Sequence, residues 1–196
     1  MEGGRALLSN LSKFSLSFVV ALLVAGRGFR IVLRRRPVGI QNGPWQTDLA
    51  LSSGKASLYT RAAAARQTPL ALRASEALYF VAHTDSAGNE LRRGRTYSIV
   101  GRDPEARWWS VAAYNNNHLI PNPRHRYSFS RDSVRRDADG HWVIRFSPRE
   151  QRENWLPGST EDGRLKLVLR CYDPAPSLLE NLGGADLPVI TSGLLL

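Results

Sequence analysis

The sequence predicts a mainly β protein: an antiparallel β-sandwich or jelly-roll with one leading α-helix, preceded by an N-terminal transmembrane helix. Three observations support this prediction. About seven short segments alternate apolar and polar residues with period two. Residues that favour turns separate these segments. One apolar stretch and one alanine-rich stretch precede them, and no internal repeat or second globular domain is evident in the sequence.

Residues 1–36 are predicted to form a membrane anchor with a basic flank. Residues 14–26 read FSLSFVVALLVAG, and a spanning helix needs about 20 mostly apolar residues. The span would therefore extend to about residue 33 and hold two arginines near one interface. A cleaved signal peptide with its cleavage site at residues 24–26 is an alternative, and a buried or interfacial helix is another.

The positive charge is concentrated beside this apolar segment. The whole chain has a net charge of +10, and residues 1–36 contain seven basic side chains against one acidic side chain. From residue 37 onward, 20 basic groups face 16 acidic groups, so the remainder is only mildly basic. We therefore expect a membrane partner and no nucleic-acid partner. The single cysteine, Cys171, excludes an internal disulfide.

After the anchor, the sequence predicts a linker at residues 37–56 and a β-sandwich domain at residues 57–196. Ser57 is a candidate N-cap of a helix, SLYTRAAAARQT, that Pro69 ends. The strands follow this helix, with Asp-Ala-Asp-Gly at 137–140 as a hairpin turn. They are predicted at residues 77–83, 96–100, 106–114, 133–136, 141–146 and 164–172, with a last edge strand at 187–191.

The strand at 106–114 and the polar loop after it form the candidate ligand-binding site. Alternation places Trp109, Val111 and Ala113 on one side, and Trp108, Ser110, Ala112 and Tyr114 on the other. Aromatic rings and neighbouring amides suit a sugar ligand, although at least one tryptophan in the core and asparagines in turns are the simpler interpretation. The predicted ligand-binding residues are Trp108, Tyr114, Asn115, Asn117 and Arg124.

A second candidate site involves histidines. His83 and Asp85 are two residues apart and would share one face of a strand, so they could act as base and orienting group together with His118 or His125. Solvated or structural histidines are the simpler interpretation. The sequence contains no His-Glu-x-x-His, Cys-x-x-Cys or Gly-x-Ser-x-Gly motif, and we predict neither a metal site nor a cofactor.

Several stretches taken in order are similar to a known family. They are GPW (43–45), YTRAAAA (59–65), EALYFVAHTDSAG (76–88), YSIVG (97–101), ARWWSVAAYNNNHLIPNP (106–123), NWLPG (154–158) and LKLVLRCYDP (165–174). The sequence resembles the bacterial domain of unknown function 1214, in a short membrane-anchored form without the companion domain 1254. The family usually has Asp and then Gly after the central tyrosine, whereas this chain has three asparagines and His118.

The resemblance implies a β-sandwich on the outer side of a bacterial inner membrane, with no established activity. The arginines after the apolar segment favour the opposite orientation, with the domain in the cytoplasm; of the two, we expect a periplasmic domain. The predicted function is a noncatalytic cell-envelope module that binds a glycan or a partner protein through the end formed by residues 109–126. The alternative is a hydrolase that uses His83 and Asp85.

Overall fold

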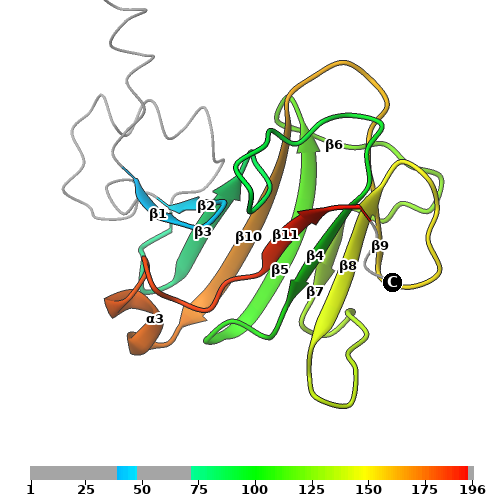
Figure 1. Ribbon diagram of the computed structural model, residues 1–196. Coiled ribbons are helices and arrows are strands. Elements are labelled where there is room, and N and C mark those ends of the chain that lie inside the picture. The colour runs from blue at the N-terminus through cyan, green and yellow to red at the C-terminus, as the bar shows by residue number, and fades with distance from the viewer. Residues whose placement is uncertain (1–38, 48–71, 194–196) are drawn as a thin grey trace, which may run out of the picture. The chain divides into compact units, whose positions relative to one another are not determined.

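The computed structural model describes residues 39–47 and 72–193, which form two β-sheets that enclose one hydrophobic core (Figure 1). The larger sheet has seven strands in the order β1-β2-β3-β10-β5-β6, with β7 also paired to β5, and the smaller sheet has four strands in the order β11-β4-β8-β9. The strands are β1 (Ile40–Asn42), β2 (Trp45–Thr47), β3 (Ala77–Ala82), β4 (Tyr97–Gly101), β5 (Ala106–Asn115), β6 (His118–Leu119), β7 (Ser128–Ser130), β8 (Trp142–Ser147), β9 (Trp155–Pro157), β10 (Leu165–Pro174) and β11 (Val189–Ser192).

Strand β10 is the centre of the larger sheet. It pairs antiparallel with β3 on one side and with β5 on the other, so that Leu169 lies opposite both Phe80 and Val111. The residues of β10 that the sequence pattern assigns to the core are buried, while those between them point to the opposite face. The period-two prediction for this strand is therefore confirmed.

A pair of tryptophans joins the two sheets. Trp109 of β5 and Trp142 of β8 are fully buried, and their rings stack with centroids 4.8 Å apart and planes 25° apart. Both sheets thus contribute to one core, and the mainly β prediction is confirmed. The pairing is not entirely antiparallel, because β9 runs parallel to β8.

Residues 40–47 lie in the segment that the sequence predicts as a linker, yet they form the hairpin β1–β2 at the edge of the larger sheet. Gly43 has a φ of +56° in the turn, a conformation that favours glycine. Trp45 is 1% exposed, and its Nε1 donates a hydrogen bond to the carbonyl of Pro188 at 2.6 Å. Burial of this one large ring attaches the short hairpin to the domain.

The predicted strand at residues 133–136 is wrong, since only Arg136 forms an isolated bridge, with Trp142. The side chain of Asn154 instead bonds both the N–H and the carbonyl of Arg135, which a regular hairpin would pair with a strand. In addition, the amides of Ser133 and Val134 both bond the carbonyl of Ser130, forming a turn. Side-chain hydrogen bonds here replace a strand ladder.

The helix of the described chain is short. Helix α3 (Pro176–Glu180) follows β10 and buries Leu178. The helix predicted after residue 57 and the anchor predicted within residues 1–36 lie outside the described residues. In the ranges 39–47 and 72–193, the structure has no helix long and apolar enough to cross a membrane.

Candidate functional site

Six side chains define a surface on the side of the larger sheet that faces away from the core, and we call it the aromatic face. The register places Tyr172 opposite Trp108, Lys166 opposite Tyr114, and Arg170 opposite Tyr79. All are half-buried. The aromatic face consists of Tyr79 from β3, Trp108 and Tyr114 from β5, and Lys166, Arg170 and Tyr172 from β10.

Two cations flank the ring of Tyr114. The Lys166 Nζ atom lies 5.5 Å from the ring centroid and the Arg170 guanidinium carbon lies 5.7 Å from it, while Arg170 Nη2 donates to the tyrosine hydroxyl. Burial lowers the pKa of Lys166, and the neighbouring charge of Arg170 adds to this effect. Burial likewise raises the pKa of Tyr79, with Tyr172 contributing. Neither cation forms an ion pair with a residue that the structure describes.

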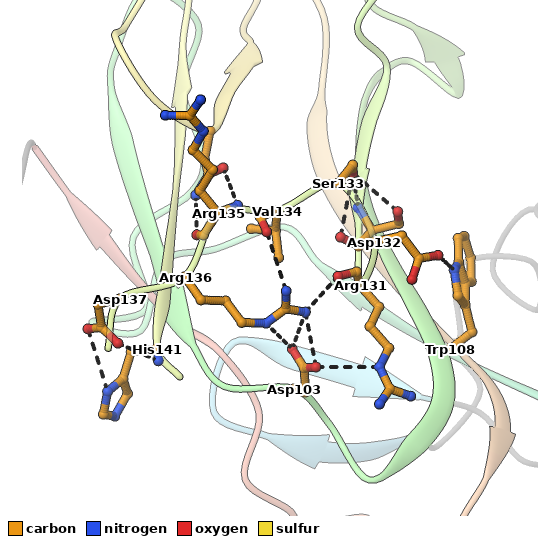
Figure 2. Close-up of polar contacts among 12 residues, drawn as sticks. Asp103, Trp108, Arg131, Asp132, Ser133, Val134, Arg135, Arg136, Asp137 and His141 are labelled. Atoms are coloured by element: carbon orange, nitrogen blue, oxygen red, sulfur yellow. Dashed lines mark hydrogen bonds and ion pairs between the residues drawn. The ribbon is translucent and has the colours of Figure 1, made fainter. Parts of the chain in front are cut away.

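The ring of Trp108 is held from two sides. It packs against Tyr172 with ring centroids 5.5 Å apart and planes tilted by 57°. Its Nε1 donates to Asp132 Oδ2 at 2.7 Å, as Figure 2 shows. Asp132 follows β7, so a loop from outside β5 fixes the orientation of the indole.

The loop that carries Asp132 is fastened by arginines that converge on Asp103 (Figure 2). Arg136 Nη2 lies 2.9 and 3.0 Å from the two carboxylate oxygens of Asp103 and also donates to the carbonyl of Arg131 at 2.7 Å. Arg131 Nε lies 3.6 Å from the same carboxylate. These basic residues therefore make structural contacts, and through them they support the position of Trp108.

The asparagines after β5 connect it to the loop before β10. Asn115 Nδ2 donates to Ser159 Oγ and to the carbonyl of Asp162, both at 3.3 Å. Asn116 Oδ1 accepts from the amide of Arg164 at 2.9 Å, and Asn117 Oδ1 accepts from Lys166 Nζ at 2.6 Å. Asn116 and Asn117 have φ values of 48° and 72°, so they occupy turn positions. The remaining predicted ligand, Arg124, is exposed and pairs with Glu150.

The three predicted catalytic residues have different surroundings. Asp85 is 4% exposed, and its Oδ1 accepts from the amides of Ala87 and Asn89 at 3.0 and 2.9 Å, which closes a turn. His83 Nδ1 lies 3.3 Å from the carbonyl of Leu165. His118 is exposed on β6. Across residues 39–47 and 72–193, no three His, Cys, Asp or Glu side chains are grouped to hold a metal ion.

His83 lines a cavity of about 460 Å³ to which neither Asp85 nor His118 contributes. Its lining comes from the loop after β3 and from the loop before β10 together with the start of β10. These two loops lie at the end of the sandwich near β6 (Figure 1). Its arginines were not predicted as site residues, although the run Arg-Arg-Gly-Arg at 92–95 is a signal that could have indicated them. The lining residues are His83, Glu90, Leu91, Arg92, Arg93, Arg95, Gly163, Arg164 and Leu165.

Two solved structures to which the chain is similar come from bacteria. The chain is similar to the VPA0106 protein from Vibrio parahaemolyticus, with 24% identity and a TM-score of 0.58 over 72% of this chain and 36% of that chain. It also matches an uncharacterised protein from Burkholderia cenocepacia, with 17% identity and a TM-score of 0.42 over 59% of this chain and 30% of that chain. The matched part is therefore about a third of each relative.

No curated protein matches the chain. The family model described as "Protein of unknown function (DUF1214)" matches residues 76–176, which run from the residue before β3 to the first residue of α3. This match covers more than half of the chain, and it includes the whole lining of the cavity. All six residues of the aromatic face also fall within these bounds, and the chain belongs to the DUF1214 family.

Proposed function

We propose that this protein is a noncatalytic, membrane-anchored module of the bacterial cell envelope that binds a glycan on the aromatic face. The observation that carries the proposal is the placement of Trp108, Tyr114 and Tyr172 on one side of a rigid sheet, beside Lys166 and Arg170. Aromatic rings offer flat apolar surfaces to the C–H groups of a sugar, and the two cations offer hydrogen-bond donors to its oxygens.

The dimensions of the face favour an oligosaccharide over a single sugar. Trp108 and Tyr114 are six residues apart on the same strand, which corresponds to roughly 20 Å. The indole is already oriented by Asp132, and the phenol by Arg170. A surface held in this way loses little side-chain freedom when a ligand binds.

The geometry gives less support to the hydrolase alternative. The Asp85 carboxylate accepts hydrogen bonds from its own turn, and its neighbour in sequence Thr84 pairs across that turn with Glu90. A carboxylate engaged in this way is poorly placed to orient His83 as a general base. We therefore keep the binding module as the single proposed function.

The binding test compares two tyrosine variants of the full-length protein in detergent. A glycan array identifies the oligosaccharide that binds best, and calorimetry then measures its affinity for each variant. We expect Tyr114→Ala to weaken binding roughly three- to tenfold, the loss that one aromatic contact brings. Tyr127→Ala is the control, because Tyr127 is exposed and lies outside the aromatic face. Equal affinities of the two variants, or capture of a protein with no glycan bound, would contradict the proposal.

The anchor and the periplasmic location are separate parts of the proposal. They rest on the apolar sequence at residues 14–33 and on the family resemblance. We expect the full chain to stay in carbonate-washed membranes, and protease added to spheroplasts to degrade its C-terminal domain. A full chain found in the soluble fraction, or a domain that only lysis exposes to protease, would contradict this part alone.

A further inference from the structure

We propose that the cavity lined by His83 and the arginines of two loops binds a phosphate group, either as the free ion or as part of a small phosphorylated molecule. We call it the arginine pocket, with the nine lining residues given above. Its volume of about 460 Å³ lies within the range of small-molecule sites in proteins. The site does not depend on the proposed glycan function, because it involves none of the six residues of the aromatic face.

The lining of the pocket carries a marked excess of positive charge. Four of the lining residues are arginines and one, Glu90, is acidic, so the formal net charge of the lining is +3 with His83 neutral. Arg93 pairs with Asp162 at 2.5 Å. The guanidinium groups of the other three arginines form no hydrogen bond or ion pair with residues 39–47 or 72–193; they are Arg92, Arg95 and Arg164.

Several arginines around one concavity, without a partner for their guanidinium groups in the described part of the chain, favour a dianion. Like charges of this kind repel one another, and a concave wall concentrates their field on whatever occupies the space. The planar guanidinium group donates two parallel hydrogen bonds to phosphate. A carboxylate has one negative charge and two acceptor oxygens. A phosphate monoester has up to two negative charges and three terminal oxygens, which suits a lining that presents these three guanidinium groups.

The backbone that carries these arginines is fixed in place. Leu91 is 6% exposed and belongs to the core, and its amide donates to the carbonyl of His83 at 2.9 Å. The amide of Arg92 donates to the hydroxyl of the buried Tyr97 at 2.7 Å. The amide of Gly94 donates to the carbonyl of Ser159 at 3.0 Å, which links the two loops that form the pocket.

The opposite wall is fixed as well. The amide of Arg164 donates to Asn116 Oδ1 at 2.9 Å, and the amide of Asn116 donates to the carbonyl of Arg164 at 3.1 Å. This reciprocal pair sets the start of β10 beside the end of β5. The backbone around the pocket is therefore in place before a ligand arrives, and the affinity for a ligand is not reduced by the cost of ordering two loops.

The test is calorimetry on the full-length protein in detergent with three probes: glucose 6-phosphate, inorganic phosphate and glucose. We expect saturable binding of the two phosphates at one site and none of glucose. Tighter binding of the ester would identify an organic phosphate as the ligand, and equal binding would identify the free ion; both results support the pocket. The absence of saturable phosphate binding at millimolar concentrations would overturn it.

A matched pair of variants separates this site from general attraction of anions to a basic protein. Arg92→Gln combined with Arg164→Gln should weaken phosphate binding roughly tenfold or more, because each change removes charged hydrogen bonds. Arg73→Gln combined with Arg152→Gln removes the same charge at exposed positions outside the pocket and should leave binding within roughly twofold of the parent. Equal losses of phosphate affinity in both pairs would mean that net charge alone attracts the ion, and would overturn the proposal. Unchanged circular dichroism would confirm that all four substitutions leave the fold intact.

Discussion

Asn154 shows how much one side chain can determine locally. It is 9% exposed with a φ of 42°, and its amide group bonds the N–H and carbonyl of Arg135 and the carbonyl of Val143, at 2.8 to 3.1 Å. Asn154→Ala leaves these groups unpaired and keeps an unfavourable backbone conformation. We expect the free energy of unfolding to fall by about 2–4 kcal/mol, measured by urea denaturation.

Gln151→Ala is the control for Asn154. Gln151 lies in the same loop and makes one exposed hydrogen bond, to the carbonyl of Arg149. Its loss should change the free energy of unfolding by no more than about 0.5 kcal/mol. Similar values for the two variants would mean that Asn154 does not organise the loop.

Cys171 supports a prediction on reactivity. Its side chain is fully buried, and burial raises the pKa of the thiol from 9.0 to about 12. Between pH 9 and pH 12 the thiol of an unfolded chain ionises, while the folded thiol stays neutral. The contribution of Cys171 to the free energy of unfolding is therefore complete below pH 9 and is lost as the pH rises towards 12. We expect no labelling by an aromatic disulfide reagent at pH 8 and complete labelling in guanidinium.

An exposed cysteine provides the comparison for Cys171. Thr160→Cys introduces a thiol at an exposed position before β10. It should react within the mixing time under native conditions, while Cys171 remains protected in the same molecule. Rapid labelling of Cys171 in the parent protein would contradict the burial of β10.

The sequence predicts the directions of side chains better than their partners. Alternation alone separates Trp109, which is fully buried, from Trp108, which faces outward. The alternation could not show that Asp132, 24 positions away, bonds the indole of Trp108. The same holds for Asp85, whose spacing from His83 suggested a shared face, while the local turn captures its carboxylate.

At the scale of elements, the hairpin β1–β2 depends on few contacts. Trp45 is its large buried side chain, and Asn42 Nδ2 donates to the carbonyls of Leu182 and Ala185 at 3.0 and 2.8 Å. We expect Trp45→Ala to lower the free energy of unfolding by about 3–5 kcal/mol, since it removes a fully buried ring. Thermal and urea unfolding measure this loss.

Trp45→Phe refines the prediction for the hairpin. It retains most of the apolar volume and loses the hydrogen bond to the carbonyl of Pro188. Trp45→Phe should lower the free energy of unfolding by much less than Trp45→Ala does. Hydrogen exchange should become faster mainly in β1 and β2. A Trp45→Ala protein as stable as the parent would show that the hairpin adds little to the domain.

Element length explains which strands the sequence reveals. The predicted strands that are confirmed have between four and ten residues, long enough to show alternation. Strands β1, β2, β6 and β9 have two or three residues each, too few for a period to appear. The parallel pairing of β9 with β8 arises from the chain path, which no local pattern encodes.

At the scale of the molecule, the sites are assembled from segments that are distant in sequence. The arginine pocket brings Arg92 beside Arg164, and the aromatic face brings Tyr79 beside Arg170. A single sequence gives neither pairing, since each depends on the order of strands in the larger sheet. Four of the six residues of the aromatic face were therefore not predicted, because they join Trp108 and Tyr114 only once β10 is placed between β3 and β5; they are Tyr79, Lys166, Arg170 and Tyr172.

The shared core leads to a prediction on cooperativity. Trp109 and Trp142 stack across the two sheets, and the core contains residues of β3, β5 and β10 as well as β4, β8 and β11. Neither sheet can therefore open without exposing apolar surface of the other, and we expect one cooperative unfolding transition for the domain. In native-state hydrogen exchange, the slowest amides of β10 and β8 should report the same free energy of opening.

Trp142→Leu provides the decisive comparison, because the change lies in the smaller sheet and removes the stacked ring while keeping an apolar side chain. If the core is one unit, exchange in β10 must become faster by the same factor as exchange in β8, although β10 contains no altered residue. A faster rate confined to β4, β8, β9 and β11 would instead mean that the sheets unfold independently. The larger sheet would then carry the aromatic face on its own.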